Sequence, residues 1–170
     1  GLVLLFVTSF WVPALLPVAK AIFVLLLAFI ILDGLLLFGK NCRVNAARRT
    51  PKIMGLGDQN PIQLELNSAA NLQLSVRVID ELPPQFQRRD FERAISLKPG
   101  QQEILQYELR PVERGQYNFG DLNLFLSTRL GLLERRWITP AETNVPVYPS
   151  VLQMKQLELR ALDRIAQHPG

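Results

Sequence analysis

Few side chains in this 170-residue sequence have the types or the spacing that catalysis needs. The single histidine is His168 and the single cysteine is Cys42, so neither a nucleophile–base pair nor a Cys and His metal cluster can be assembled. The carboxylate pairs Asp80-Glu81 and Asp90-x-Glu92 are expected to be ordinary surface groups, because the sequence offers no framework that would raise one pKa. We therefore expect no enzyme activity, no metal ligands and no cofactor.

The sequence also lacks the residues that nucleotide binding and nucleic-acid binding require. Gly115 and Gly120 have the spacing that opens a phosphate-binding loop, yet Asp121-Leu122 stands where Lys and Ser or Thr are required. The net charge is +4, but part of that excess lies in one short cluster, and no face interleaves basic and aromatic residues. We therefore expect neither a nucleotide site nor nucleic acid as a partner.

One carboxylate has an unusual position. Residues 1–38 contain only two ionisable side chains, Lys20 and Asp33, and Asp33 falls within a run of Leu, Ile, Val and Phe. A carboxylate inside a membrane span is costly and is often functional, as in proton relays or helix pairing. Because no second ionisable group lies inside the run to form a relay, the sequence favours an anchoring or helix-pairing role for this intramembrane polar residue.

The apolar run predicts the element that positions Asp33. Residues 21–38 have about the length of the roughly 20 residues that cross about 30 Å of hydrocarbon, so we predict a transmembrane helix there. Pro13 and Pro17 are expected to interrupt any helix before it. Residues 2–12 are apolar but too short to span, which favours a hairpin whose first helix is truncated. A secretory signal fits less well, since it needs a basic start and a shorter apolar core.

Five cations follow the predicted span with no acid among them, namely Lys40, Arg43, Arg48, Arg49 and Lys52. The turn before the span offers only Lys20, so the positive-inside rule places the folded part in the cytoplasm. The unpaired Cys42 agrees with a reducing compartment. The same cations would also attract anionic lipid headgroups, by about 1 kcal/mol each, although a topology signal is the favoured role.

The rest of the sequence has the pattern of short strands. Residues 62–66 and 72–78 alternate apolar and polar side chains, as strands with one buried face do, and further strand-like runs cover residues 91–97, 104–109, 122–126, 133–139 and 145–148. Roughly six to eight strands in about 110 residues predict an antiparallel β-sandwich of immunoglobulin-like type. Residues 151–167 lack Gly and Pro and predict a short linker helix.

The predicted organisation is therefore a membrane-anchored all-β protein in three parts. Residues 1–39 form a transmembrane helical hairpin, residues 40–150 form the β-sandwich domain, and residues 151–170 form a C-terminal linker helix. The lipid bilayer is the first partner that this organisation predicts, and the sequence does not indicate an oligomeric state.

The most distinctive stretch covers residues 109–136. It contains Arg114-Gly115-x-Tyr117-x-Phe119-Gly120 and a Leu130-Gly131-Leu132 turn, and Tyr148-Pro149 follows later. The glycines stand where tight turns or close backbone approach are expected, and the two aromatic residues alternate onto one strand face. We expect Arg114 to bond carbonyls across the corner. A structural role for these residues is favoured over a binding site, because aromatic-anchored corners recur in sandwich folds.

These motifs resemble a widespread bacterial family of uncharacterised membrane proteins, and Leu32-Asp33 matches a Leu-Asp near the end of that family's hairpin. The resemblance implies a transmembrane hairpin, a β-sandwich and a C-terminal von Willebrand factor A-like domain, encoded beside MoxR-type AAA+ ATPases. The family's turn usually reads Ser-Pro-Leu-Gly-Leu, and here Thr128 and Arg129 replace its start. No Asp-x-Ser-x-Ser metal motif is present, so we expect the sequence to be an N-terminal portion.

The function expected on these grounds is a membrane-tethered interaction module at the bacterial inner membrane. It would face the cytoplasm and present a downstream domain, with client proteins, to an AAA+ ATPase. The alternative is an envelope protein whose immunoglobulin-like domain lies outside the membrane and binds surface ligands. An enzymatic function would need catalytic residues beyond Gly170.

Overall fold

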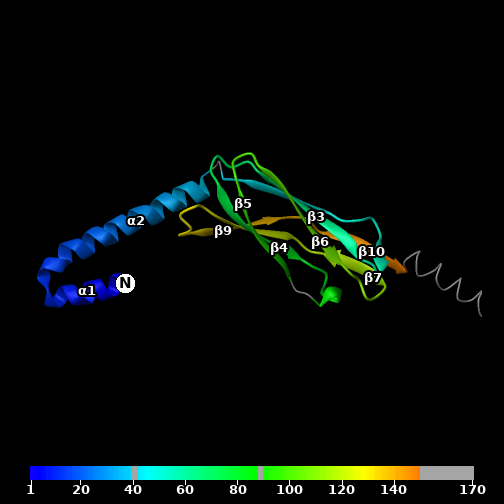
Figure 1. Cartoon of the computed structure of the whole chain (residues 1–170), viewed down its shortest axis with the longest axis horizontal. Coiled ribbons are helices and arrows are strands. Elements are labelled where there is room, and N and C mark those ends of the chain that lie inside the picture. The colour runs from blue at the N-terminus through cyan, green and yellow to red at the C-terminus, as the bar shows by residue number, and fades with distance from the viewer. Residues whose placement is uncertain (40–41, 88–89, 150–170) are drawn as a thin grey trace, which may run out of the picture.

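The computed structural model describes residues 1–39, 42–87 and 90–149. It begins with the short helix α1 (Leu2–Trp11), the 3-10 turn η1 (Pro13–Leu15) and the long helix α2 (Leu16–Phe38), which fold back on each other as a hairpin (Figure 1). Phe6 and Phe23 pack edge to face between the two helices, with ring centroids 6.3 Å apart. The hairpin expected from the sequence is thus present as a pair of helices.

The long helix begins five residues earlier than the predicted residue 21. α2 begins at Leu16, so Pro17 lies in its first turn, where the missing amide proton costs no hydrogen bond. Only Pro13 lies at the interruption between the helices, within η1. α2 has 23 residues, a length of about 34 Å at about 1.5 Å per residue.

α2 is long enough and apolar enough to cross a membrane, with a mean hydropathy of 2.9 over its most apolar window. Only 11% of that window is buried within the protein, so its Leu, Ile, Val and Phe side chains face outward on all sides. A core helix of a water-soluble domain would bury an apolar face instead. A single apolar helix near the N-terminus is a feature that membrane anchors and signal sequences share.

The part that follows is a β-sandwich, as predicted. Within the described residues its strands are β1 (Val44–Arg49), β2 (Met54–Leu56), β3 (Asn60–Ser68), β4 (Leu74–Glu81), β5 (Asp90–Leu97), β6 (Gln102–Leu109), β7 (Gly115–Phe119), β8 (Leu122–Ser127), β9 (Glu134–Thr139) and β10 (Thr143–Pro149). A short 3-10 turn, η2 (Pro84–Phe86), follows β4. The strands form the sheets β1-β3-β6, β5-β4-β8-β9 and β2-β10-β7. Every pairing is antiparallel except that of β2 with β10.

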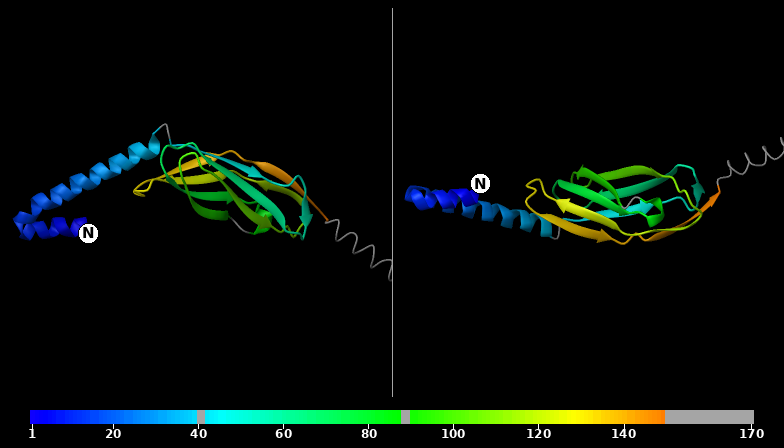
Figure 2. Two further views of the ribbon diagram at one scale, coloured as in Figure 1. Left: turned by 45° about the horizontal axis from the view of Figure 1, so that its top comes forward. Right: turned by 90° about the horizontal axis from the view of Figure 1, so that it is seen from below.

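The three sheets make two layers (Figure 2). One layer is the sheet β1-β3-β6. The other two sheets lie end to end and together form the second layer. Short connections from β7 to β8 and from β9 to β10 join these two sheets. Leu64, Val76 and Leu124 belong to the buried cluster under the four-stranded sheet. Ile62 and Tyr117 belong to the cluster under the other one. This arrangement confirms the predicted immunoglobulin-like antiparallel sandwich.

The strand prediction differs from the structure at two places. β2 has only three residues, too few for an alternating pattern to appear. β1 contains Arg48 and Arg49, which the sequence presents as part of a basic flank and not as a strand. The predicted linker helix lies outside the described residues.

Arg48 lies inside the sandwich, with a side chain only 1% exposed. It pairs with the buried carboxylate of Asp80 on β4, where its Nε donates to Oδ2 at 3.1 Å and its Nη2 donates to Oδ1. The same guanidinium donates to the carbonyls of Ala141 at 2.8 Å and Gly120 at 2.9 Å. The hydroxyl of Tyr107 also donates to Asp80. This network joins the two layers and fixes both bends between the end-to-end sheets.

Burial, reinforced by the negative charge of Asp80, raises the pKa of Tyr107 well above its ordinary value. Tyr107 therefore stays protonated and keeps its role as a donor. Every oxygen of Asp80 and all three nitrogens of the Arg48 guanidinium then have partners. A buried ion pair with its remaining groups satisfied is the arrangement in which burial of two charges is tolerated. The prediction that Asp80 is an ordinary surface group is wrong, because its cation comes from a different strand.

The other predicted topology cations differ from Arg48. Arg49 forms a surface pair with Glu65, with 2.6 Å between Nε and Oε1, while Arg43 and Lys52 are exposed. Lys40 lies outside the described residues. The burial of Arg48 in the folded domain does not remove it from the positive-inside argument, because orientation is decided while the chain inserts and before the domain folds. The cytoplasmic orientation of the sandwich stays a prediction.

Two neighbouring arginines of β1 provide a matched test of the buried network. Arg48→Ala is expected to lower the free energy of unfolding by about 3 to 5 kcal/mol, because it leaves Asp80 buried without its cation. Arg49→Ala is expected to change it by less than about 1 kcal/mol, because its pair is exposed. Denaturant unfolding in detergent, followed by the fluorescence of Trp137 in a Trp11→Phe background, measures both. Equal losses in the two variants would contradict a core role for Arg48.

Candidate functional site

The best-built polar site of the described residues is where α2 meets the sandwich. Asp33 is fully buried against the loop between β8 and β9. Its Oδ2 accepts hydrogen bonds from the backbone amides of Leu132 at 3.0 Å and Leu133 at 2.8 Å, and its Oδ1 accepts one from the Thr128 hydroxyl. The amide of Leu130 in turn donates to that hydroxyl at 3.1 Å. We call residues 128–133 the Asp33 seat.

The local sequence explains the shape of this seat. Gly131 has a φ of +64°, a left-handed conformation that costs glycine little and other residues more. The turn at Gly131 directs the next two amides toward one carboxylate oxygen. Thr128 supplies the hydroxyl of this seat, and Arg129 is exposed. The Leu32-Asp33 and Leu130-Gly131-Leu132 motifs are far apart in the sequence, but in the structure the second motif supplies an amide donor to the carboxylate of the first.

The last turn of α2 is held on the same side. Leu37, four residues after Asp33, lies on the same helix face and is fully buried in the larger core cluster. Nη1 of Arg135 on β9 donates to the carbonyl of Leu37 at 3.3 Å. The Arg135 guanidinium lies over the rings of Phe38 and Trp137, 5.2 and 5.0 Å from their centroids. A cation at a helix C-terminus is also favoured by the helix dipole.

These contacts assign partners to Asp33. Its three donors are two backbone amides and one hydroxyl of the sandwich, and none of them is a titratable group. The arrangement anchors a helix to a domain and supplies no chain of proton carriers. Among the described residues no second helix contacts the Asp33 carboxylate, so these contacts show an anchoring role and give no evidence of helix pairing.

The aromatic motif forms a corner at the far end of the sandwich. Tyr117 is buried, and its hydroxyl donates to the carbonyl of Glu113, four residues upstream, at 3.0 Å. Its ring packs against Phe86, with centroids 4.9 Å apart, and Phe119 is buried beside it. Gly115 has a φ of +145°, which its lack of a side chain permits. A buried tyrosine whose hydroxyl donates to a carbonyl a few residues upstream resembles the tyrosine corner of sandwich folds.

Arg114 does not make the bonds expected of it. It is exposed, and in the described part of the chain Arg110 crosses the corner instead, where its Nε donates to the carbonyl of Gly57 at 2.6 Å. Gly120 is needed for close approach, because a Cβ there would run into the carboxylate of Glu81. Its carbonyl also serves the buried network of Arg48.

Tyr148 and Pro149 lie at the end of β10, opposite the helices (Figure 1). They pair in parallel register with Gly55 and Leu56 of β2. The ring of Tyr148 is exposed. Both residues mark the end of the sandwich from which the chain continues.

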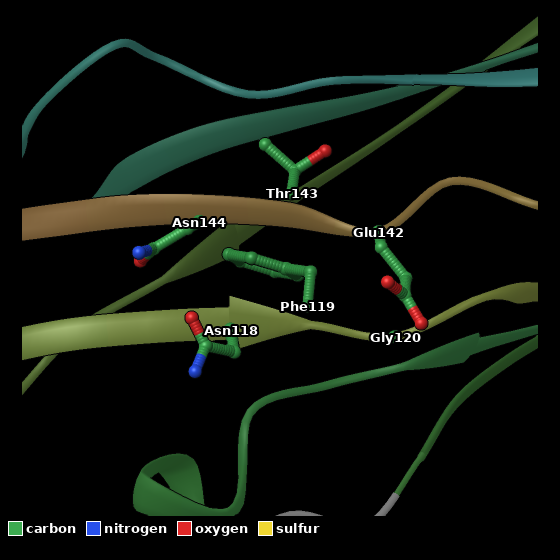
Figure 3. A pocket seen from close by; sticks show the side chains of 6 residues that line it. All are labelled: Asn118, Phe119, Gly120, Glu142, Thr143 and Asn144. Atoms are coloured by element: carbon green, nitrogen blue, oxygen red, sulfur yellow. The ribbon is translucent and has the colours of Figure 1, made fainter.

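An open hollow of about 520 Å³ lies on the face of β7 and β10 (Figure 3). Asn118, Phe119, Gly120, Glu142, Thr143 and Asn144 line it. Asn118 and Asn144 are opposite each other in the ladder, so the wall offers amide and hydroxyl groups with a single carboxylate. The described residues contain no group of three or more His, Cys, Asp and Glu side chains that would hold a metal ion. The hollow is suited to hydrogen bonding and not to acid–base chemistry.

Cys42 is a buried thiol in this structure. It is 1% exposed and belongs to the larger core cluster. Burial raises its pKa, with a smaller opposing effect of Arg135. Since the thiolate is the reactive form, Cys42 has a packing role.

The fold and its principal site define a class of protein: an immunoglobulin-like β-sandwich fixed by a buried carboxylate to an apolar helix of membrane-spanning length. The chain matches no protein-family model and no curated protein. Among solved structures it is similar to the CARDB domain of the PF1109 protein from Pyrococcus furiosus in complex with di-metal ions, with 15% identity over 64% of this chain and 90% of that one and a TM-score of 0.48. It is also similar to PapD-like domain 7 of human CEP192, with 10% identity, 65% and 88% coverage and a TM-score of 0.48. Such distant similarity carries no metal or partner over to this chain.

Removal of the Asp33 carboxylate tests the seat. In Asp33→Ala the amides of Leu132 and Leu133 lose a charged acceptor whose bonds contribute about 1.5 to 3 kcal/mol each, so their hydrogen exchange should accelerate about ten-fold or more. Thr128→Val removes one hydroxyl bond and should have a smaller effect. Exchange measured in detergent reports both, with the central amides of β4 as the internal control. Unchanged exchange at Leu132 and Leu133 in Asp33→Ala would contradict the described contact.

Proposed function

We propose that this protein is a membrane-tethered, cytoplasm-facing interaction module of the bacterial inner membrane. It works with a MoxR-type AAA+ ATPase by presenting a C-terminal domain and client proteins to it. The observation that carries this proposal is the Asp33 seat, because it fixes the sandwich to α2 while β10 ends on the opposite side (Figure 1). A module of this shape holds whatever follows β10 away from the helix in a defined direction.

The buried contacts of α2 favour a permanent anchor over a removable signal. Leu37 is part of the sandwich core, and the amides of Leu132 and Leu133 depend on Asp33 as an acceptor. Removal of the helix would expose to water the apolar core residues that pack against Leu37, and it would take the charged acceptor from the amides of Leu132 and Leu133. Both changes destabilise a fold. A signal sequence is removed from the mature protein, so its side chains are not part of the core of the folded domain.

The proposed orientation rests on charge. Five cations follow α2 closely in the sequence, namely Lys40, Arg43, Arg48, Arg49 and Lys52, whereas Lys20 is the only cation toward the hairpin turn. This asymmetry favours the cytoplasm for the sandwich. The proposed partnership with an ATPase rests on the resemblance of the Leu32-Asp33 and Leu130-Gly131-Leu132 motifs to a family encoded beside such enzymes.

Orientation is testable with an introduced cysteine. Cys42 is a poor reporter because it is buried, so we choose Val112→Cys, an exposed position at the far corner of the sandwich. In intact cells a membrane-impermeant maleimide should leave this cysteine unlabelled, and permeabilisation should allow labelling. The unsubstituted chain measures the background from Cys42. Labelling in intact cells would instead support the alternative of an externally exposed, ligand-binding envelope domain.

The ATPase partnership is tested by affinity purification. The product of the complete gene, extracted in detergent under nucleotide-trapping conditions, should recover an AAA+ ATPase that is lost when nucleotide is removed. The gene downstream of Gly170 should encode a domain with the Asp-x-Ser-x-Ser motif. Absence of both the ATPase and that motif would refute the proposed function and leave the membrane-anchored sandwich intact.

A further inference from the structure

The loop between β8 and β9 projects further toward the helices than any other part of the sandwich, and it runs beside the end of α2 (Figures 1 and 2). At its tip Leu130 is 42% and Leu132 48% exposed, although both lie next to the buried carboxylate of Asp33. Leu35 and Leu36 of α2 are exposed at the same level of the helix. Leu36 of the helix and Leu130 of the loop also line one hollow, so exposed apolar side chains of the loop and the helix meet there.

The position of Asp33 along α2 sets the depth of this surface. Asp33 follows the first residue of the helix, Leu16, by 17 positions, a rise of about 25 Å at about 1.5 Å per residue. A hydrocarbon layer of about 30 Å that starts at Leu16 therefore extends about one turn beyond Asp33. Lys20 is exposed near the start of the helix, and its preference for the interface shifts the span further toward the sandwich.

We propose that the loop between β8 and β9 inserts into the interfacial layer of the membrane that α2 crosses. Leu130 and Leu132 contact the upper parts of the lipid acyl chains, and the exposed guanidinium of Arg129 lies among the phosphates. The proposal rests on the membrane anchor of the proposed function but not on any protein partner.

The hydrogen bonds of the loop fit this environment. Irregular backbone enters an apolar layer only where its polar groups have partners. The amide of Leu130 donates to the Thr128 hydroxyl, and the amides of Leu132 and Leu133 donate to Asp33. The contact that joins the helix to the sandwich therefore also removes three amide protons from competition for water.

A hollow beside the loop agrees with a lipid occupant. It has a volume of about 270 Å³ and is lined by Leu36, Leu72, Gln73, Thr128, Arg129 and Leu130. Its walls are mostly apolar, with Arg129 as the only charged residue. An acyl chain in this hollow with its phosphate at Arg129 would satisfy both the apolar walls and the cation.

The test places an environment-sensitive fluorophore on Leu130→Cys and Leu132→Cys in the 170-residue chain. The chain is reconstituted in vesicles of phosphatidylcholine and phosphatidylglycerol, and Cys42 is retained because it is buried. Both loop positions should show blue-shifted emission and quenching by a lipid nitroxide that is several-fold stronger than at the exposed Val112→Cys. Quenching by aqueous iodide should follow the opposite order.

A third position separates this proposal from the anchor itself. Leu25 is 59% exposed in the middle of α2, so Leu25→Cys should be shielded from iodide wherever the helix spans the bilayer. If Leu25→Cys is shielded while both loop positions are as accessible to iodide as Val112→Cys, loop insertion is refuted and the anchor stands. If Leu25→Cys is also accessible, the membrane anchor fails, and the proposed insertion fails with it.

Discussion

A carboxylate on an apolar helix must find hydrogen-bond donors, and the placement of the sandwich follows from where Asp33 finds them. Its donors belong to the loop between β8 and β9, so the sandwich lies against the end of α2. That placement buries Leu37 in the core and brings Arg135 to a carbonyl at the helix end. The carboxylate of the apolar helix thus serves as an attachment point for the sandwich.

The same principle operates inside the sandwich. Arg48 and Asp80 are both buried, and each is satisfied by groups from several strands. Their partners include the carbonyls of Gly120 and Ala141, which lie at the two bends of the divided layer. Buried charges in this protein therefore occur where separate pieces of the fold meet.

The local sequence pattern predicts most of the strands of the fold. The contacts that it does not predict join residues that are far apart in the sequence. The alternation in β3 and β4 and the aromatic corner around Tyr117 are readable from neighbouring residues. Arg48 looks like a surface cation because its partner Asp80 lies 32 residues away. Asp33 and Thr128 are 95 residues apart, so the sequence shows both motifs but not their contact. The bond expected of Arg114 is made by Arg110 instead, because the direction of a side chain depends on a turn that spacing alone does not define.

The two ends of the sandwich have a mechanical consequence. β10 lies between β2, which is parallel to it, and β7, which is antiparallel, and it ends opposite the attachment of α2. A pull on the chain beyond Pro149 would act along β10, so the hydrogen bonds of both ladders would be loaded in shear together and would not open one at a time. The load would then pass through the core to Asp33 and Leu37.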